Sequence, residues 1–151
     1  MKQILTLFSP LGLIHLEIED KQVSCLHFAD GVETPSLPKD GLAFLMMERL
    51  SAYFKDPMVH FRDIPLAPAK SDFGAKVRTL LLSLCPGEVL TYGEAARLLK
   101  TSPRALGQSL AKNPLPIVIP CHRIVAKNGE GGYMGYKQHP IKSWLLMHER
   151  R

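Results

Sequence analysis

The spacing of apolar residues changes once along this chain, and that change limits the folds it can adopt. Segments 2–8, 12–19 and 21–28 are rich in apolar and β-branched residues, and the middle segment alternates over most of its length. Short turn-like sequences separate them, which predicts a three-stranded antiparallel sheet. Behind Asp40, a residue type suited to a helix N-cap, apolar residues recur at helical spacing up to Tyr53. We therefore predict an α+β fold that begins with a small sheet-plus-helix module.

A change of composition separates this module from the rest of the chain. Pro57, Pro65 and Pro68 break any regular element after the predicted helix. We therefore assign residues 1–68, including this proline-rich linker, to an N-terminal module and residues 69–151 to a second domain.

The second domain is predicted to be mostly helical. Its helix signals are an apolar pattern over 73–84, a capping box at 91–94, a Ser-Pro start at 102–103 and a last helix near 141–150. The two short helices in the middle are joined by a tight turn. This arrangement predicts a helix-turn-helix within a winged-helix-like domain.

Charge is distributed unevenly between the two halves of the chain. Residues 1–69 contain 6 Lys and Arg against 9 Asp and Glu, a net charge of −3. Residues 70–151 contain 13 Lys and Arg against 5 Asp and Glu, a net charge of +8. This asymmetry indicates that the second half meets a polyanion, although basic side chains also solvate ordinary surfaces.

Cysteine usage and the N-terminal sequence predict the compartment. Cys25, Cys85 and Cys121 are odd in number and widely spaced, which argues against a secreted disulfide framework. The N-terminus lacks a signal-peptide pattern, and no apolar run reaches transmembrane length. We expect an intracellular, cytoplasmic protein without membrane contact.

The stretch PIVIPCHRIV, residues 116–125, brings an apolar run to a thiol, an imidazole and a guanidinium. Only a few per cent of a free thiol is ionised at neutral pH, yet the thiolate is the nucleophile. A histidine can take the proton, directly or through water, and a carboxylate can orient that histidine. His122 adjoins Cys121, and Glu149 in the last helix is the best acidic candidate. We therefore predict a nucleophilic cysteine, while a cysteine in an apolar run can also serve packing alone.

Four motifs give the chain a family resemblance. TYGEAARLL, RALG, NPLPIVIPCHRIV and WLLMHE, at matching separations, resemble the O6-alkylguanine-DNA alkyltransferases, also called methylated-DNA–protein-cysteine methyltransferases. The resemblance is strong over residues 71–151 and weak over the remainder. It implies a DNA-repair protein that flips O6-alkylguanine, chiefly O6-methylguanine, out of the duplex and transfers the alkyl group irreversibly to Cys121. O4-methylthymine is a further candidate substrate. The resemblance also implies a single turnover, a monomer, no cofactor, and double-stranded DNA bound through its minor groove.

The resemblance assigns a chemical role to five residues. Cys121 matches the alkyl acceptor, His122 the base that acts through water, and Glu149 the carboxylate that orients the histidine. Tyr92 matches the tyrosine whose hydroxyl meets N3 of the flipped guanine. Asn113 matches the asparagine that links the helix-turn-helix to the active-site turn.

Residues at the start of the second short helix match the family's DNA contacts. Arg104 matches the arginine finger that fills the gap left by the extruded base. The small residues Ala105 and Gly107 would permit a close approach to the minor groove. Ser102 and Arg123 complete the DNA contacts that we expect.

The resemblance also implies a substrate pocket and its lid. Backbone groups of Cys121 and Ile124 would read the edge of the base. The lid would be formed by Tyr133, Met134 and Gly135. This chain departs from the family there, with Tyr136 where a second glycine is common and extra length between 137 and 140. Acceptance of adducts larger than methyl therefore stays open.

Two other functions remain compatible with these residues. One is a non-catalytic helix-turn-helix regulator in which Cys121 is a packing residue, and the other is a Cys–His hydrolase acting on small molecules. Cys25 and His27 suit zinc, which some relatives hold in the N-terminal module. Two further ligands would be needed and none is evident, so we expect no metal.

Overall fold

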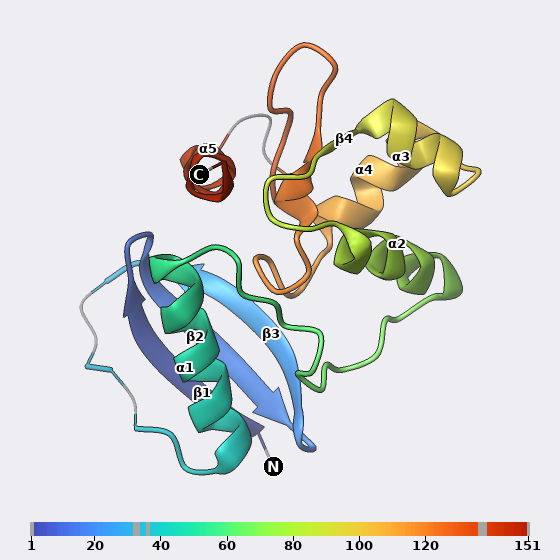
Figure 1. Cartoon of the computed structure of the whole chain (residues 1–151). Coiled ribbons are helices and arrows are strands. Elements are labelled where there is room, and N and C mark those ends of the chain that lie inside the picture. Colours follow the sequence, from blue (N-terminus) through green and yellow to red (C-terminus); the bar gives the residue numbers. More distant parts are fainter. Residues whose placement is uncertain (1, 32–33, 36, 136–138, 151) are drawn as a thin grey trace. The chain divides into compact units, whose positions relative to one another are not determined.

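A computed structural model describes residues 2–31, 34–35, 37–135 and 139–150. The chain divides into two compact units, residues 1–67 and 68–151 (Figure 1). Unit 1 contains a three-stranded sheet and a helix, and unit 2 is mostly helical. The predicted α+β class is confirmed. None of the helices in the described part of the chain has the length and apolarity that a membrane crossing requires.

The sheet of unit 1 is the predicted antiparallel meander. Its strands follow in sequence order: β1 (Lys2–Ser9), β2 (Gly12–Glu19) and β3 (Gln22–Ala29). Leu5 lies opposite Leu16, which in turn lies opposite Leu26, so one face of the sheet is apolar. Asp20 and Lys21 have φ of 52° and 61° and form the two-residue turn that joins β2 to β3.

Helix α1 (Gly41–Lys55) lies along this sheet (Figure 1). It begins where predicted, since the carboxylate of Asp40 accepts a hydrogen bond from the N–H of Ala43 at 2.8 Å. Its buried face consists of Ala43, Met46, Leu50 and Tyr53. This face recurs every three or four residues, which explains why the sequence pattern was sufficient to predict the helix.

The proline-rich segment after α1 is packed rather than a free linker. The N–H of Val23 donates to the carbonyl of Pro65, and the N–H of Ala67 donates to the carbonyl of Val23, both at 2.9 Å. Phe61 and Ile64 are buried. The segment therefore continues the hydrogen bonding of β3 and belongs to unit 1.

Unit 2 carries its elements in the order α2 (Asp72–Ser83), β4 (Leu90–Thr91), α3 (Tyr92–Leu98), α4 (Pro103–Ala111), η1 (Cys121–Arg123), β5 (Ile124–Val125) and α5 (Pro140–Glu149). Ser71 caps α2 and Ser102 caps α4 through their hydroxyl groups. Thr91 and Glu94 form the predicted capping box of α3. The N-cap of α5 was not predicted from the sequence. It is His139, whose ring nitrogen accepts a hydrogen bond from the N–H of Ile141.

A short parallel strand pairing brings together two segments that are distant in the sequence. Leu90 in β4 pairs with Ile124 in β5, and Thr91 pairs with Val125. Tyr92 directly follows β4, and the turn that carries Cys121 directly precedes β5. The approach to that turn, residues 115–120, is wholly buried. The pairing therefore ties the segment that leads into Tyr92 to the segment that follows Cys121, with the two residues flanking opposite ends of the two-stranded sheet.

Candidate active site

Cys121 borders a pocket within unit 2. The pocket has a volume of about 90 Å³ and is lined by Tyr92, Gly107, Leu110, Ala111, Cys121, Gly132, Tyr133, Met134 and Gly135. Cys121 is 4% exposed. Cys121 is thus almost enclosed by protein, yet it lines the pocket together with residues of α4 and of the loop 132–135.

The predicted partners of the cysteine are brought together and buried. His122 Nε2 lies 2.8 Å from Glu149 Oε2. Burial by itself would raise the pKa of Glu149, but hydrogen bonds from His122 and Arg123 outweigh it and hold the pKa below its usual range. Burial lowers the pKa of His122, and Glu149 offsets this only in part. At neutral pH the pair is therefore a carboxylate and a neutral imidazole.

The hydrogen bond to Glu149 fixes the tautomer of His122. A carboxylate can only accept, so the proton of the neutral ring must lie on Nε2. The other nitrogen, Nδ1, is then an unprotonated acceptor. It is buried and has no hydrogen-bond partner among the residues described. His122 therefore offers a free base nitrogen one residue from the thiol.

Cys121 needs such a base because its thiol is not acidic. Burial raises its pKa to about 11, while the side chain of Asn113 and the charge of Lys142 act in the opposite direction. Asn113 also donates to the carbonyl of Ile119 at 2.8 Å and accepts the N–H of Leu115 at 3.0 Å. It thus ties the end of α4 to the chain that leads into Cys121.

Tyr92 also lines the pocket. Its hydroxyl donates to the carbonyl of Gly132 at 3.4 Å, a long hydrogen bond. Burial raises its pKa, so the phenol keeps its proton at neutral pH. Gly131 has φ of 79°, and a Cβ there would lie 2.9 Å from Cε2 of Tyr92. A glycine is therefore required for the loop to pass the ring.

The buried pair makes stability depend on pH. The pKa of His122 in the folded protein lies below its usual 6.5, and that of Glu149 below its usual 4.5. Below each usual value the unfolded chain takes up a proton that the folded chain resists, so acid favours unfolding. We expect the melting temperature to be highest above about pH 6.5 and to fall in two stages on titration to about pH 3. In Glu149→Gln the lower stage should become smaller without vanishing, because Glu17, Asp63 and Glu88 also have lowered pKa values. A melting temperature independent of pH across this range would contradict the buried pair.

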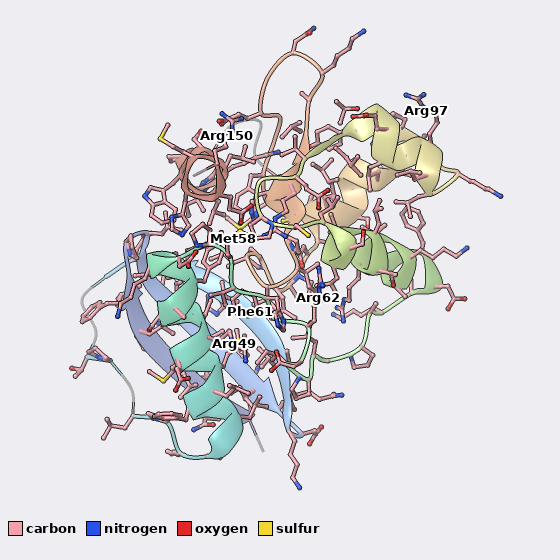
Figure 2. All side chains as sticks on the ribbon, in the orientation of Figure 1. Arg49, Met58, Phe61, Arg62, Arg97 and Arg150 are labelled. Carbon is pink, nitrogen blue, oxygen red and sulfur yellow. The ribbon has the colours of Figure 1, made fainter. Side chains whose placement is uncertain are left out.

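The residues expected to meet DNA lie in and beside α4. Arg104 is exposed in its first turn, next to the cap formed by Ser102, and Ala105 is half-buried. Gly107 lies on the wall of the pocket. Another exposed cation, Arg97, points outward from α3 (Figure 2). Sequence reasoning had assigned Gly107 only to DNA approach and had missed its place on the pocket wall.

Arg123 is placed differently from the prediction. It is 7% exposed, and its guanidinium donates to both carboxylate oxygens of Glu149, at 2.9 and 3.0 Å. A third hydrogen bond, of 2.6 Å, goes to the carbonyl of Leu84. A guanidinium engaged in this way is not available to a DNA phosphate, so we correct its role to holding Glu149 in place.

Ile124 is fully buried and does not line the pocket. Its N–H donates to the carbonyl of Cys121, and its carbonyl accepts from Lys142 at 2.7 Å. A carbonyl oxygen has two lone pairs, so the part of Cys121 and Ile124 in reading the base stays a prediction.

The predicted lid residues all line the pocket. Tyr133 is buried, Met134 is half-buried and Gly135 is exposed. Tyr136 lies outside the described residues. So do residues 137 and 138, where the sequence predicts extra length in the loop. Lys142, which sequence reasoning did not single out, is buried beside this loop.

Cys25 and His27 gain one further donor in the structure. Ligand atoms of Glu17, Cys25 and His27 lie within 4.8 Å of one another, and this is the one such group found among the described residues. Glu17 is already paired with Lys2 at 2.5 Å, and burial raises the pKa of Cys25 to about 11. An ammonium group beside the donors and a protonated thiol fit a cation poorly. We therefore assign no metal ion to Glu17, Cys25 and His27.

Fold and site together define a protein with a cysteine on the wall of a pocket, a buried histidine–glutamate pair at the next residue, and two short helices joined by a tight turn. Comparison with known proteins agrees with this class. The family described as "6-O-methylguanine DNA methyltransferase, DNA binding domain" matches residues 72–151. A methylated-DNA–protein-cysteine methyltransferase of Metallosphaera sedula is 38% identical over 128 residues, which cover 85% of this chain and 81% of that protein.

Solved structures give the same result. The crystal structure of the Mycobacterium tuberculosis O6-methylguanine methyltransferase has a TM-score of 0.80 at 30% identity and covers 99% of this chain and 93% of that one. A structure of Mycobacterium tuberculosis OGT in complex with DNA has a TM-score of 0.81 at 29% identity, covering 96% and 91%. The chain belongs to the methylated-DNA–protein-cysteine methyltransferase family, as its motifs predicted. Its activity is DNA repair by transfer of the methyl group of O6-methylguanine to a cysteine.

Proposed function

We propose that Cys121 is the cysteine that accepts the methyl group. The observation that carries this proposal is the position of Cys121 on the wall of the pocket, with the buried His122–Glu149 pair at the adjacent residue. Cys25 lies in the other unit, and Cys85 is exposed and does not line this pocket. Of the three cysteines, Cys121 is the one that lines this pocket.

The transfer is a substitution at the O6 carbon. The thiol proton of Cys121 passes through water to Nδ1 of His122, and the resulting imidazolium is stabilised by Glu149. The sulfur forms a bond to the methyl carbon while the bond between that carbon and O6 breaks. The electron pair of the broken bond stays on the purine. Tyr92, which keeps its proton at neutral pH, turns its hydroxyl from the long hydrogen bond with Gly132 and donates at N3 to the developing charge. A proton returned through His122 leaves guanine and a thioether.

The thioether explains a single turnover. Thiol exchange does not cleave a carbon–sulfur bond to an alkyl group, so the acceptor is consumed once for each lesion. O6-methylguanine is the main substrate in this proposal, and O4-methylthymine is a further one because it presents the same oxygen-bound methyl group.

The site requires that the base leave the duplex. The O6 carbon of a stacked base cannot reach a residue that is 4% exposed, so the nucleotide must be flipped at a cost of about a few kcal/mol. Arg104 is exposed at the start of α4, whose later residues line the pocket. We assign it to the gap in the stack, with α4 in the minor groove and Ser102 and Ala105 at the contact. The structure of Mycobacterium tuberculosis OGT in complex with DNA supports DNA as the partner. That the DNA is a duplex and the protein a monomer is part of this proposal.

Duplex DNA with a labelled O6-methyl group tests the proposal against its rivals. We expect one label per protein molecule on Cys121, with no release of labelled methanol. Binding of the duplex without label on the protein would support a DNA-binding regulator instead. Catalytic release of label would support a hydrolase.

A further inference from the structure

The loop that carries Tyr133 contains a strained backbone position. Gly132, Tyr133, Met134 and Gly135 line the pocket together with Cys121. Met134 has φ of 51°, a left-handed conformation that residues other than glycine rarely adopt. Such a backbone persists where its surroundings hold it in place. Side chains that pack against this loop from other elements are therefore candidates for setting the shape of the pocket.

His139 contacts this loop from the start of α5. The centroids of the His139 and Tyr133 rings lie 5.8 Å apart, and the ring planes meet at 64°. These values describe an edge-to-face contact, an arrangement that aromatic rings favour. Tyr133 is 3% exposed and lines the pocket, whereas His139 is half-buried and does not line it. His139 thus supports Tyr133 from outside the cavity.

A second contact fixes the orientation of the His139 ring. Its Nδ1 accepts the N–H of Ile141 at 3.1 Å, which makes His139 the N-cap of α5. Asn, Asp, Ser or Thr would satisfy the same N–H with a smaller side chain. Capping alone therefore does not require a ring at this position, and the contact with Tyr133 gives the ring a use.

Another side chain of α5 holds the same loop a few residues earlier. The hydroxyl of Ser143 donates to the carboxylate of Glu130. Ser143 lies four residues after His139, about one helical turn further along α5. The loop is therefore attached to the first turn of α5 at Glu130 and again at Tyr133, and of these two attachments the one at Tyr133 reaches a pocket residue.

We infer that His139 is a positioning residue for the methyl transfer, whose ring holds Tyr133 in place against the cavity that receives the flipped base. The inference rests on the proposed function, in which the base enters the pocket beside Cys121. It adds to that function a residue that lies outside the pocket and acts through Tyr133.

Two substitutions separate the two contacts of His139. His139→Asn keeps a cap, because asparagine is a preferred N-cap residue, but it removes the ring. His139→Phe keeps an aromatic ring beside Tyr133 but removes the cap. Ser71→Ala is the matched control, because it removes the hydroxyl cap of α2 in the same unit and Ser71 does not line the pocket.

Each of the three variants should lose about 2–4 °C in melting temperature, because each loses one contact of comparable strength. The rate of methyl transfer at saturating duplex should fall only in His139→Asn, by at least about tenfold, because Tyr133 loses the ring that holds it. His139→Phe and Ser71→Ala should transfer within about threefold of the parent rate. A rate within about threefold in His139→Asn, or an equal loss in either other variant, would overturn the inference.

Fluorine NMR gives a second measurement that needs no repair activity. 3-Fluorotyrosine labels all four tyrosines, and the signal of Tyr133 is the one missing from Tyr133→Phe. This signal should broaden in His139→Asn, because the ring of Tyr133 becomes mobile, and should keep the parent line width in His139→Phe and Ser71→Ala. An unchanged line width in His139→Asn would overturn the inference. Absence of methyl transfer in the parent protein would count against the proposed function, while the line width would still decide whether His139 holds Tyr133.

Discussion

Replacing Cys121 with serine should abolish methyl transfer from O6-methylguanine in duplex DNA. An alcohol is a far weaker nucleophile than a thiol toward an alkyl carbon. The base His122 remains in this variant, but it does not make up for the loss of the sulfur. DNA affinity should stay within about threefold of the parent protein, because the residue is 4% exposed and contributes little surface to a contact. Transfer is measured as radioactivity retained on the protein, and affinity by fluorescence anisotropy on the same duplex.

Cys85→Ser is the matched control for this substitution. Cys85 is an exposed thiol of the same unit and does not line the pocket. It should transfer label at the rate of the parent protein. Retained transfer in Cys121→Ser, or a loss of transfer in Cys85→Ser, would contradict the assignment of the acceptor.

Of the substitutions proposed, Glu149→Gln should lower the free energy of unfolding the most. The carboxylate accepts from His122 and twice from Arg123, all within buried surroundings. A neutral amide leaves the buried guanidinium of Arg123 without its counter-charge, which costs about 3–5 kcal/mol. Denaturation of the protein in urea, followed by the fluorescence of the single tryptophan, Trp144 in α5, measures the change in the free energy of unfolding.

Glu94→Gln is the control for charge and size at an exposed position. Glu94 accepts the N–H of Thr91 in the capping box of α3, and glutamine can accept the same hydrogen bond. We expect a change within about 0.5 kcal/mol. A similarly small change in Glu149→Gln would show that Glu149 does not hold Arg123 as the structure indicates.

Features that depend on neighbouring residues were predictable from the sequence. The caps at Asp40 and Ser102 and the capping box at Thr91 each act within three residues of the helix start, so their signals are local. The strands of unit 1 were predictable for a similar reason, since their apolar faces repeat within single segments.

Roles that depend on distant partners were not predictable. Nothing in the local sequence of Arg123 shows that Glu149 and the carbonyl of Leu84 would surround it, so its charge suggested DNA contact. Likewise, nothing in the sequence around Ile124 shows that Lys142 from α5 donates to its carbonyl. In both cases burial and long-range pairing decided the outcome, and a single sequence gives neither directly.

Peptide mass spectrometry after reaction with excess methylated duplex tests the central claim most directly. The account predicts that the peptide containing Cys121 gains the mass of one CH₂ as S-methylcysteine, in step with the loss of O6-methylguanine from the DNA. Methylation at Cys25 or Cys85 instead, or repaired DNA with an unmodified Cys121, would contradict it.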